Sequence, residues 1–214
     1  ARKHQPGLLV VDRTVGGEYE NYVTPEGHVP DADLGVPWET CMPMGTSWSW
    51  VPNEQYKSTD EIIRTLVSVV SRGGSLLLNV APGPDGQLDS TAYVRLKEVG
   101  EWMKVNGEAV YGTRPSRYNA PTAALGSSEK VMSSRSGEEK HIMYVFLDGS
   151  SAEVRMDMHA LRRAPEVKLL GSTSQLKWQK ITATGVIVIP ADPDPDRVRV
   201  LRINARLPVG IKKL

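Results

Sequence analysis

The chain has 214 residues, and 26 Lys and Arg against 25 Asp and Glu give a formal net charge of +1. This balance supplies no strong field to attract nucleic acid or an acidic membrane, and no stretch is long and apolar enough to span a bilayer. The only cysteine is Cys41, and the four histidines are scattered without ligand spacing. The sequence therefore predicts no internal disulfide and no metal site.

The N-terminal third begins without an initiator methionine or an apolar signal core, so we expect a piece of a longer protein or a naturally shortened one. The apolar run Leu8–Asp12 predicts a strand covered on both faces, as in parallel sheets. Residues 13–37 are rich in Gly and Pro without periodicity, which is typical of a long functional or disordered loop. A second strand is expected over 37–42.

Two helices and a third strand are predicted next. A capping box at Ser58–Glu61 starts the first helix, and Gly73-Gly74 ends it. The apolar run 75–80 predicts another fully buried strand. The second helix begins at Asp89 or Ser90 and ends at Asn106-Gly107. Its expected inward face consists of Val94, Leu96, Val99, Trp102 and Met103.

Alternating strands and helices predict βα units around a parallel sheet, in which active sites gather at the carboxyl ends of the strands. Asp12, Arg13, Glu39 and Asn79 are expected at or near such ends. We interpret Asn79 as bonding to loop backbone rather than to a ligand.

Beyond residue 116 the pattern changes to short segments with β-branched or alternating apolar residues, separated by turn clusters, which predicts an antiparallel β-sandwich. We therefore expect two domains, residues 1–116 and 117–214, with a mobile loop within the Ser-, Ala- and Gly-rich stretch 120–137. The segments expected to form strands are 141–147, 152–158, 167–170, 176–178, 186–189 and 198–203.

The most suggestive chemical feature is Glu39, which follows Trp38 and precedes a loop with Trp48 and Trp50. Indole rings offer apolar faces to the C–H surface of a sugar, and a partly desolvated carboxyl group can protonate a leaving glycosidic oxygen. The two loop tryptophans are equally compatible with packing at the rim. Such chemistry needs a second carboxylate, and the chain has no obvious one.

A series of blocks along the chain closely resembles the α-L-fucosidases of glycoside hydrolase family 29. The resemblance is dense over residues 1–115 and weaker through the expected sandwich. The ordered combination is far more specific than any single motif. The blocks are GLLVVDR at 7–13, WETCM at 38–42, YKS at 56–58, SRGGSLLLNV at 71–80, PDG at 84–86, GEW at 100–102 and NGEAVYGT at 106–113.

The resemblance implies a retaining exo-glycosidase that releases terminal L-fucose from glycoconjugates. The implied fold is α/β followed by all-β, with a truncated TIM-like (β/α) barrel and then a C-terminal antiparallel β-sandwich. In the family, an Asp upstream of the segment matching Leu8–Asp12 is the nucleophile. That half of the barrel, with the fucose-binding histidines, has no counterpart here. No metal or organic cofactor is implied.

The resemblance also suggests roles for individual residues. Glu39 matches the carboxylate usually taken as the acid/base, and Glu26 falls in a loop where some members place the acid instead. Arg13 matches an arginine near the sugar. It could pair with Asp12 or Glu18 or hold the nucleophile ionised. The loop carrying Trp48 and Trp50 would support the substrate.

The expected partner is a fucosylated oligosaccharide or glycoside. A half-barrel exposes an apolar strand edge and uncovered faces, which favour association. We therefore expect a homo-oligomer or pairing with an N-terminal barrel half. The alternative function is a catalytically inactive carbohydrate-binding or scaffold remnant of a fucosidase. Linkage specificity and cellular compartment stay open.

Overall fold

The computed structural model describes residues 1–11, 13, 17–32, 34–116, 124–133, 138–157, 166–173, 175–181, 184–190 and 192–208. A βα part comes first, with β1 (Trp38–Pro43), α1 (Thr59–Ser71), β2 (Gly74–Asn79), α2 (Ser90–Asn106) and the 3-10 helix η1 (Gly107–Ala109). The later strands are β3 (Arg114–Pro115), β4 (Gly126–Ser133), β5 (Glu138–Leu147), β6 (Glu153–Asp157), β7 (Glu166–Leu169), β8 (Gln175–Leu176), β9 (Trp178–Ile181), β10 (Thr184–Val188) and β11 (Arg199–Pro208).

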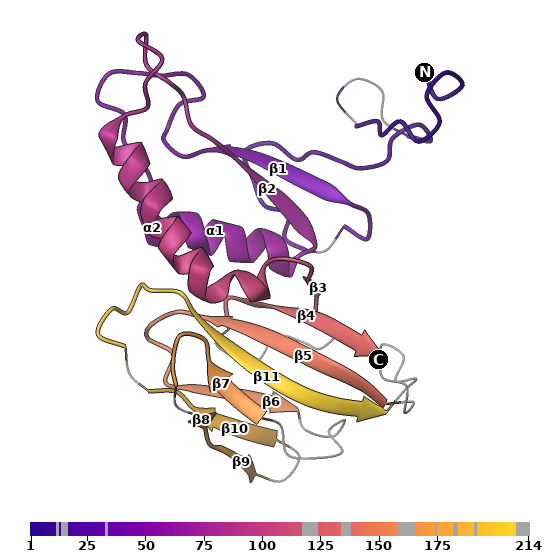
Figure 1. Cartoon of the computed structure of the whole chain (residues 1–214), viewed down its shortest axis with the longest axis vertical. Helices are drawn as coiled ribbons and strands as arrows, with labels where there is room; N and C mark the ends of the chain where they lie inside the picture. Colours follow the sequence, from indigo (N-terminus) through magenta and orange to yellow (C-terminus); the bar gives the residue numbers. More distant parts are fainter. Residues whose placement is uncertain are drawn as a thin grey trace.

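The two strands of the βα part, β1 and β2, are parallel, as predicted, with Trp38 opposite Gly74 and Pro43 opposite Asn79 (Figure 1). The segment 22–26, which the sequence placed in a loop, runs parallel beside β1, with bridges from Val23 to Trp38 and from Glu26 to Cys41. A further bridge joins Val11 to Tyr22. The parallel arrangement is therefore wider than the two regular strands.

Helix α1 begins and ends where the sequence predicts. The Ser58 hydroxyl accepts a bond from the Glu61 N–H at 3.2 Å, and the Glu61 carboxylate accepts one from the Ser58 N–H at 2.7 Å. Helix α2 also has its predicted bounds, but its expected inward face is partly wrong. Val94 and Leu96 are exposed, because α2 packs through the stripe of Ala92, Val99 and Trp102.

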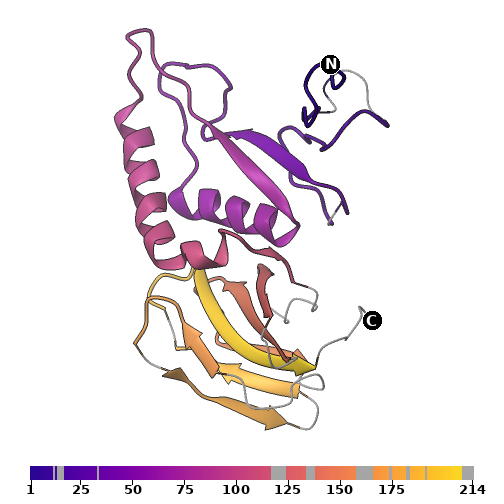
Figure 2. The ribbon, with the colours of Figure 1, turned by 45° about the vertical axis from the view of Figure 1, so that its right-hand side comes forward.

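The helices lie on one side of β1 and β2 (Figures 1 and 2). On that side Trp38 is buried, and its indole N–H donates to the Arg72 carbonyl at 2.9 Å. A side chain at Gly74 would collide with the same indole. On the other side Leu77 is 52% exposed. The strand predicted over 8–12 is wrong for the described residues of that segment, which form only the isolated bridge at Val11 and leave Leu9 70% exposed. The expectation that both strand runs are buried on two faces is therefore wrong, since no described element covers the second face.

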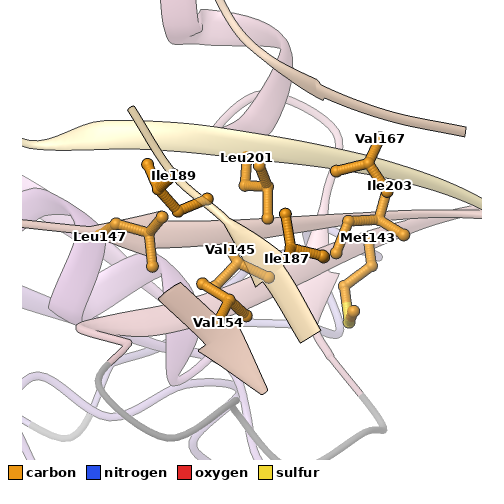
Figure 3. Packing of buried hydrophobic residues seen from close by; sticks show 9 residues of the cluster. All are labelled: Met143, Val145, Leu147, Val154, Val167, Ile187, Ile189, Leu201 and Ile203. Carbon is orange, nitrogen blue, oxygen red and sulfur yellow. The ribbon is translucent and has the colours of Figure 1, made fainter. Parts of the chain in front are cut away.

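The later strands form two sheets, with orders β3-β4-β5-β11-β7-β8 and β6-β10-β9. Their pairings are antiparallel, which confirms the predicted sandwich pattern. Apolar side chains of both sheets fill the space between them, among them Val145, Val154 and Leu201 (Figure 3). Within the stretch 120–137, which was predicted to contain a mobile loop, residues 126–133 form β4. Residues 120–123 and 134–137 lie outside the described residues.

The helices of the βα part pack on the outer face of the larger sheet (Figures 1 and 2). Strand β5 presents Val145 to the sandwich core and Tyr144 and Phe146 to the cluster that contains Ile63 of α1. The period of two along a strand explains this division. The two parts thus share one apolar cluster, in which side chains of α1 and α2 pack on the outer face of the larger sheet.

Candidate functional site

The carboxyl ends of β1 and β2 lie at Pro43 and Asn79, which are opposite each other in the register. Asn79 is at a strand end, as predicted, and its side-chain amide donates to the Trp48 carbonyl at 3.0 Å, which confirms a bond to loop backbone. Glu39 is the second of the six residues of β1. The expectation that Glu39 lies at or near the carboxyl end is therefore wrong, because β1 continues for four residues beyond it. Asp12 lies outside the described residues.

Glu39 and Cys41 alternate with Trp38 and Thr40, which are buried toward the helices. Successive side chains of a strand point to opposite faces, so Glu39 and Cys41 project from the face that the helices leave open. Glu26 is paired with Cys41 and belongs to the same face. Two carboxylates from adjacent parallel segments therefore share this surface.

The electrostatics of the Cys41 thiol place the same groups around it. Burial raises the pKa of the thiol, Glu26 raises it further, Arg13 lowers it, and Glu39 adds a smaller increase. A raised pKa keeps the thiol protonated and poorly nucleophilic. Cys41 thus lies among charged side chains but is a poor candidate for the nucleophile.

Arg13 and Glu26 form an ion pair, and each side chain is 48% exposed. From the sequence, both residues were predicted in one loop with no contact between them, and Asp12 and Glu18 were the expected structural partners of Arg13. The parallel bridges of the segment 22–26 bring Glu26 next to β1 and so into reach of Arg13. We call Arg13, Glu26, Glu39 and Cys41 the charged cluster.

The two tryptophans of the following loop have different surroundings. Trp48 is 44% exposed, whereas Trp50 is half-buried and lines a small pocket that is open to solvent. A Cβ on Gly83 would lie 3.4 Å from the Trp50 indole nitrogen, an ordinary van der Waals distance, so the turn at Gly83 packs beside this ring. The other lining residues are Gly45, Ser47, Glu54, Tyr56, Asn79, Val80 and Ala81.

Three residues that sequence reasoning did not single out support this pocket. The Tyr56 hydroxyl donates to Asp89 at 2.8 Å, and burial, followed by that bond, raises the pKa of Tyr56 to about 12. The Lys57 ammonium donates to the Pro43 carbonyl at 2.7 Å and the Gly45 carbonyl at 3.1 Å. Glu54 binds backbone across the loop. The block YKS at 56–58 carried the only sequence signal for two of them.

Within the part of the chain that the structure describes, no group of three or more His, Cys, Asp or Glu side chains could hold a metal ion. Among the same residues, no helix has the length and apolar character needed to cross a membrane.

Comparison with known proteins adds an independent result. A family model described as alpha-L-fucosidase matches residues 1–108. Plasma alpha-L-fucosidase of Homo sapiens is 32% identical over 173 residues, which are 78% of this chain and 36% of that protein. An alpha-L-fucosidase of Branchiostoma floridae is 28% identical over 156 residues, or 71% of this chain and 33% of that protein. The chain spans about a third of the length of these relatives.

Two solved structures share the fold of this chain. Alpha-L-fucosidase isoenzyme 1 from Paenibacillus thiaminolyticus superposes with a TM-score of 0.77 at 22% identity, over 95% of this chain and 51% of that chain. Thermotoga maritima alpha-fucosidase superposes with a TM-score of 0.68 at 25% identity, over 94% of this chain and 46% of that chain. Both the βα part and the sandwich are therefore included in the likeness.

Proposed function

Because this chain belongs to the α-L-fucosidase family, we propose that it forms part of a retaining exo-α-L-fucosidase that releases terminal L-fucose from glycoconjugates. The observation that carries this proposal is the charged cluster, which places Arg13, Glu26 and Glu39 on the face of β1 that the helices leave open. A carboxylate pair with an arginine beside it is suited to acid/base work on a glycosidic bond.

The proposal includes a truncated (β/α) barrel for residues 1–116, followed by a sandwich domain for residues 117–214. Parallel pairing of β1 and β2, with helices on one side only, supports this division. In a closed barrel the second face of the strands points to the interior. Further barrel strands, from an N-terminal part or another copy of the chain, would then cover Leu77, which is exposed on that face.

Strand register favours Glu26 over Glu39 as the acid/base residue. Glu26 is level with Cys41, and Glu39 lies two residues earlier in β1. At the usual rise per residue, Glu26 is about 6–7 Å nearer the carboxyl ends of the strands. Active sites of barrel enzymes lie at those ends, and the tryptophan loop leaves β1 there. Glu39 remains the alternative to be tested beside it.

The proposed reaction is a double displacement. The acid/base carboxyl group gives its proton to the departing glycosidic oxygen while the nucleophile bonds to the anomeric carbon. The resulting carboxylate then takes a proton from water, whose oxygen displaces the nucleophile and restores the enzyme. The nucleophile would lie ~5–5.5 Å from the acid/base residue, and we assign it to the part of the assembly that this chain does not supply.

Arg13 and the tryptophans have supporting roles in this proposal. The Arg13 guanidinium contacts the Glu26 carboxylate and can orient it through a charge-assisted hydrogen bond. The exposed ring of Trp48 is available to the apolar face of a sugar, whereas the half-buried Trp50 shapes the adjoining pocket. Trp48 is therefore the better candidate for the sugar platform.

Release of 4-nitrophenol from its α-L-fucoside tests the function. The chain would be assayed alone and together with the remaining part of the human plasma relative, with Glu26→Ala and Glu39→Ala as variants. Loss of acid/base catalysis costs roughly 10²–10⁴-fold in rate, and we expect it in Glu26→Ala, with Glu101→Ala on α2 as an unaffected control. A large loss in Glu39→Ala alone would move the role to Glu39. L-Fucose binding without turnover in every combination would instead identify a carbohydrate-binding remnant.

A further inference from the structure

The loop that carries both tryptophans is closed at its base. This loop, residues 44–57, leaves the carboxyl end of β1 and leads to α1; we call it the aromatic loop. The Lys57 N–H donates to the Met44 carbonyl at 3.0 Å, and the Lys57 ammonium donates to the Pro43 and Gly45 carbonyls. The two ends of the loop are therefore bonded to each other.

Glu54 bonds the two sides of the loop to each other a second time, farther from the base. Its Oε1 accepts bonds from the Thr46 N–H at 2.9 Å, the Thr46 hydroxyl at 2.7 Å and the Gln55 N–H at 2.9 Å. The backbone bond from Thr46 is the largest cause that lowers the pKa of Glu54, so the group is ionised near neutral pH. Bonds to an ionised acceptor are the stronger kind.

The backbone around Glu54 is shaped for this contact. A Cβ on Gly45 would lie 2.5 Å from the Glu54 side chain, so the close approach requires a glycine there. Asn53 has a φ of 58°, in the left-handed region that Asn tolerates better than most residues. This turn brings the returning leg of the loop back so that Glu54 faces Thr46.

The tip of the loop, at Trp48, is bonded to the end of β2. The Asn79 amide donates to the Trp48 carbonyl, and Trp50 lines the same pocket as Glu54 and Asn79. The Glu54 Oε1 atom already accepts three bonds, so this oxygen is committed to the loop. These bonds join Thr46, which precedes both tryptophans in the loop, to Gln55, which follows them.

We propose that Glu54 is a positioning residue, whose carboxylate closes the neck of the aromatic loop and so holds Trp48 and Trp50 at the carboxyl ends of β1 and β2. The structural part of this inference stands on the loop contacts alone. Its consequence for sugar binding rests on the proposed function. A bound L-fucose would meet rings that are already in place, which avoids the cost of ordering them on binding.

The test uses the whole chain with fluorinated tryptophan and fluorine NMR. Trp48→Phe and Trp50→Phe assign the two resonances. We expect Glu54→Ala to shift and broaden both of them, leave Trp102 unchanged, and speed amide exchange at Thr46 and Gln55 by about tenfold, as loss of bonds to a charged group implies. Glu54→Gln keeps an accepting oxygen and should restore most of the wild-type spectrum. Glu101→Ala is the matched control for loss of an exposed carboxylate.

A titration with L-fucose separates this inference from the proposed function. We expect the Kd to rise by about tenfold in Glu54→Ala and to recover largely in Glu54→Gln. Unchanged Trp48 and Trp50 resonances with unchanged amide exchange in Glu54→Ala would overturn the positioning role. Altered resonances in that variant would support the positioning role, and they would contradict the proposed function if the wild-type chain, completed by the remaining part of the human relative, does not respond to L-fucose.

Discussion

The sandwich and the βα part of the chain bury their strands in different ways. In the sandwich, β5 has Val145 against the second sheet and Phe146 against the helix-side cluster, and both are fully buried. In the βα part, the helices cover one face of β2, while Leu77 on the other face is 52% exposed. Strands of similar apolar character thus differ in burial, because β5 is covered on both faces and β2 is covered on one. The two sheets of the sandwich cover each other, whereas no described element covers the second face of β2.

Matched leucine truncations should give the largest effect. Leu201 is completely buried between the sheets, whereas Leu77 is half exposed. Leu201→Ala should lower the free energy of unfolding by about 2–5 kcal/mol, and Leu77→Ala should change it by less than ~0.5 kcal/mol. Urea denaturation of both variants measures this. Equal losses would mean that the open face is covered in solution and part of the fold.

Self-association is the second test of the open face. Exposed apolar surface of this kind drives association, so light scattering at micromolar concentration should show an oligomer. Leu77→Asp should weaken the association by about tenfold or more, because a charge would have to be buried in the contact. A well-defined monomer of the wild-type chain would contradict the expectation that β1 and β2 need a partner.

The capping of the two helices offers a smaller contrast. Ser58 caps α1 through a reciprocal pair of bonds with Glu61, whereas Asp89 makes no side-chain cap for α2. Ser58→Ala should cost about 1 kcal/mol of stability, and Ser90→Ala should be nearly neutral. Thermal unfolding followed by circular dichroism compares them. A neutral Ser58→Ala would show that tertiary packing alone sets the start of α1.

The smallest expected effect is on alkaline stability. The pKa of Tyr56 is raised from 10.0 to about 12, so the folded chain favours the protonated phenol. That contribution is complete below pH 10 and is lost as the pH rises toward about 12, with at most about 1 kcal/mol involved after solvent screening. Unfolding at several alkaline pH values should show this loss in the wild type and not in Tyr56→Phe. The same slope in both would assign it to another group.

Local signals in the sequence were sufficient for elements whose bonds are local. The capping box at Ser58–Glu61 and the glycines at 73–74 predicted the bounds of α1, since those bonds join neighbouring residues. Apolar runs such as Leu8–Asp12 predicted burial but carried no information on what would cover them. Val94 and Leu96 were wrongly predicted on the inward face of α2, because tertiary packing decides which side chains of a helix are covered.

The candidate site was predicted by residue type and less well by position. Arg13, Glu26 and Glu39 were named from the sequence, but the ion pair between the first two depends on a segment with no strand pattern. Parallel bridges between distant segments cannot be seen in either segment alone. The closure of the aromatic loop by Glu54 and Lys57 was missed because it uses backbone carbonyls and amides, which every residue possesses.

Azide rescue of the acid/base variant tests the central claim most directly. Azide needs no base to remove a proton, so it can displace the nucleophile from the fucosyl-enzyme when the carboxylate is absent. With 4-nitrophenyl α-L-fucoside and the chain completed by the remaining part of the human relative, Glu26→Ala should regain activity in azide and form α-L-fucosyl azide, because azide enters from the face that water would use. Formation of the β anomer would make Glu26 the nucleophile, and rescue of Glu39→Ala instead would contradict the assignment drawn from the strand register.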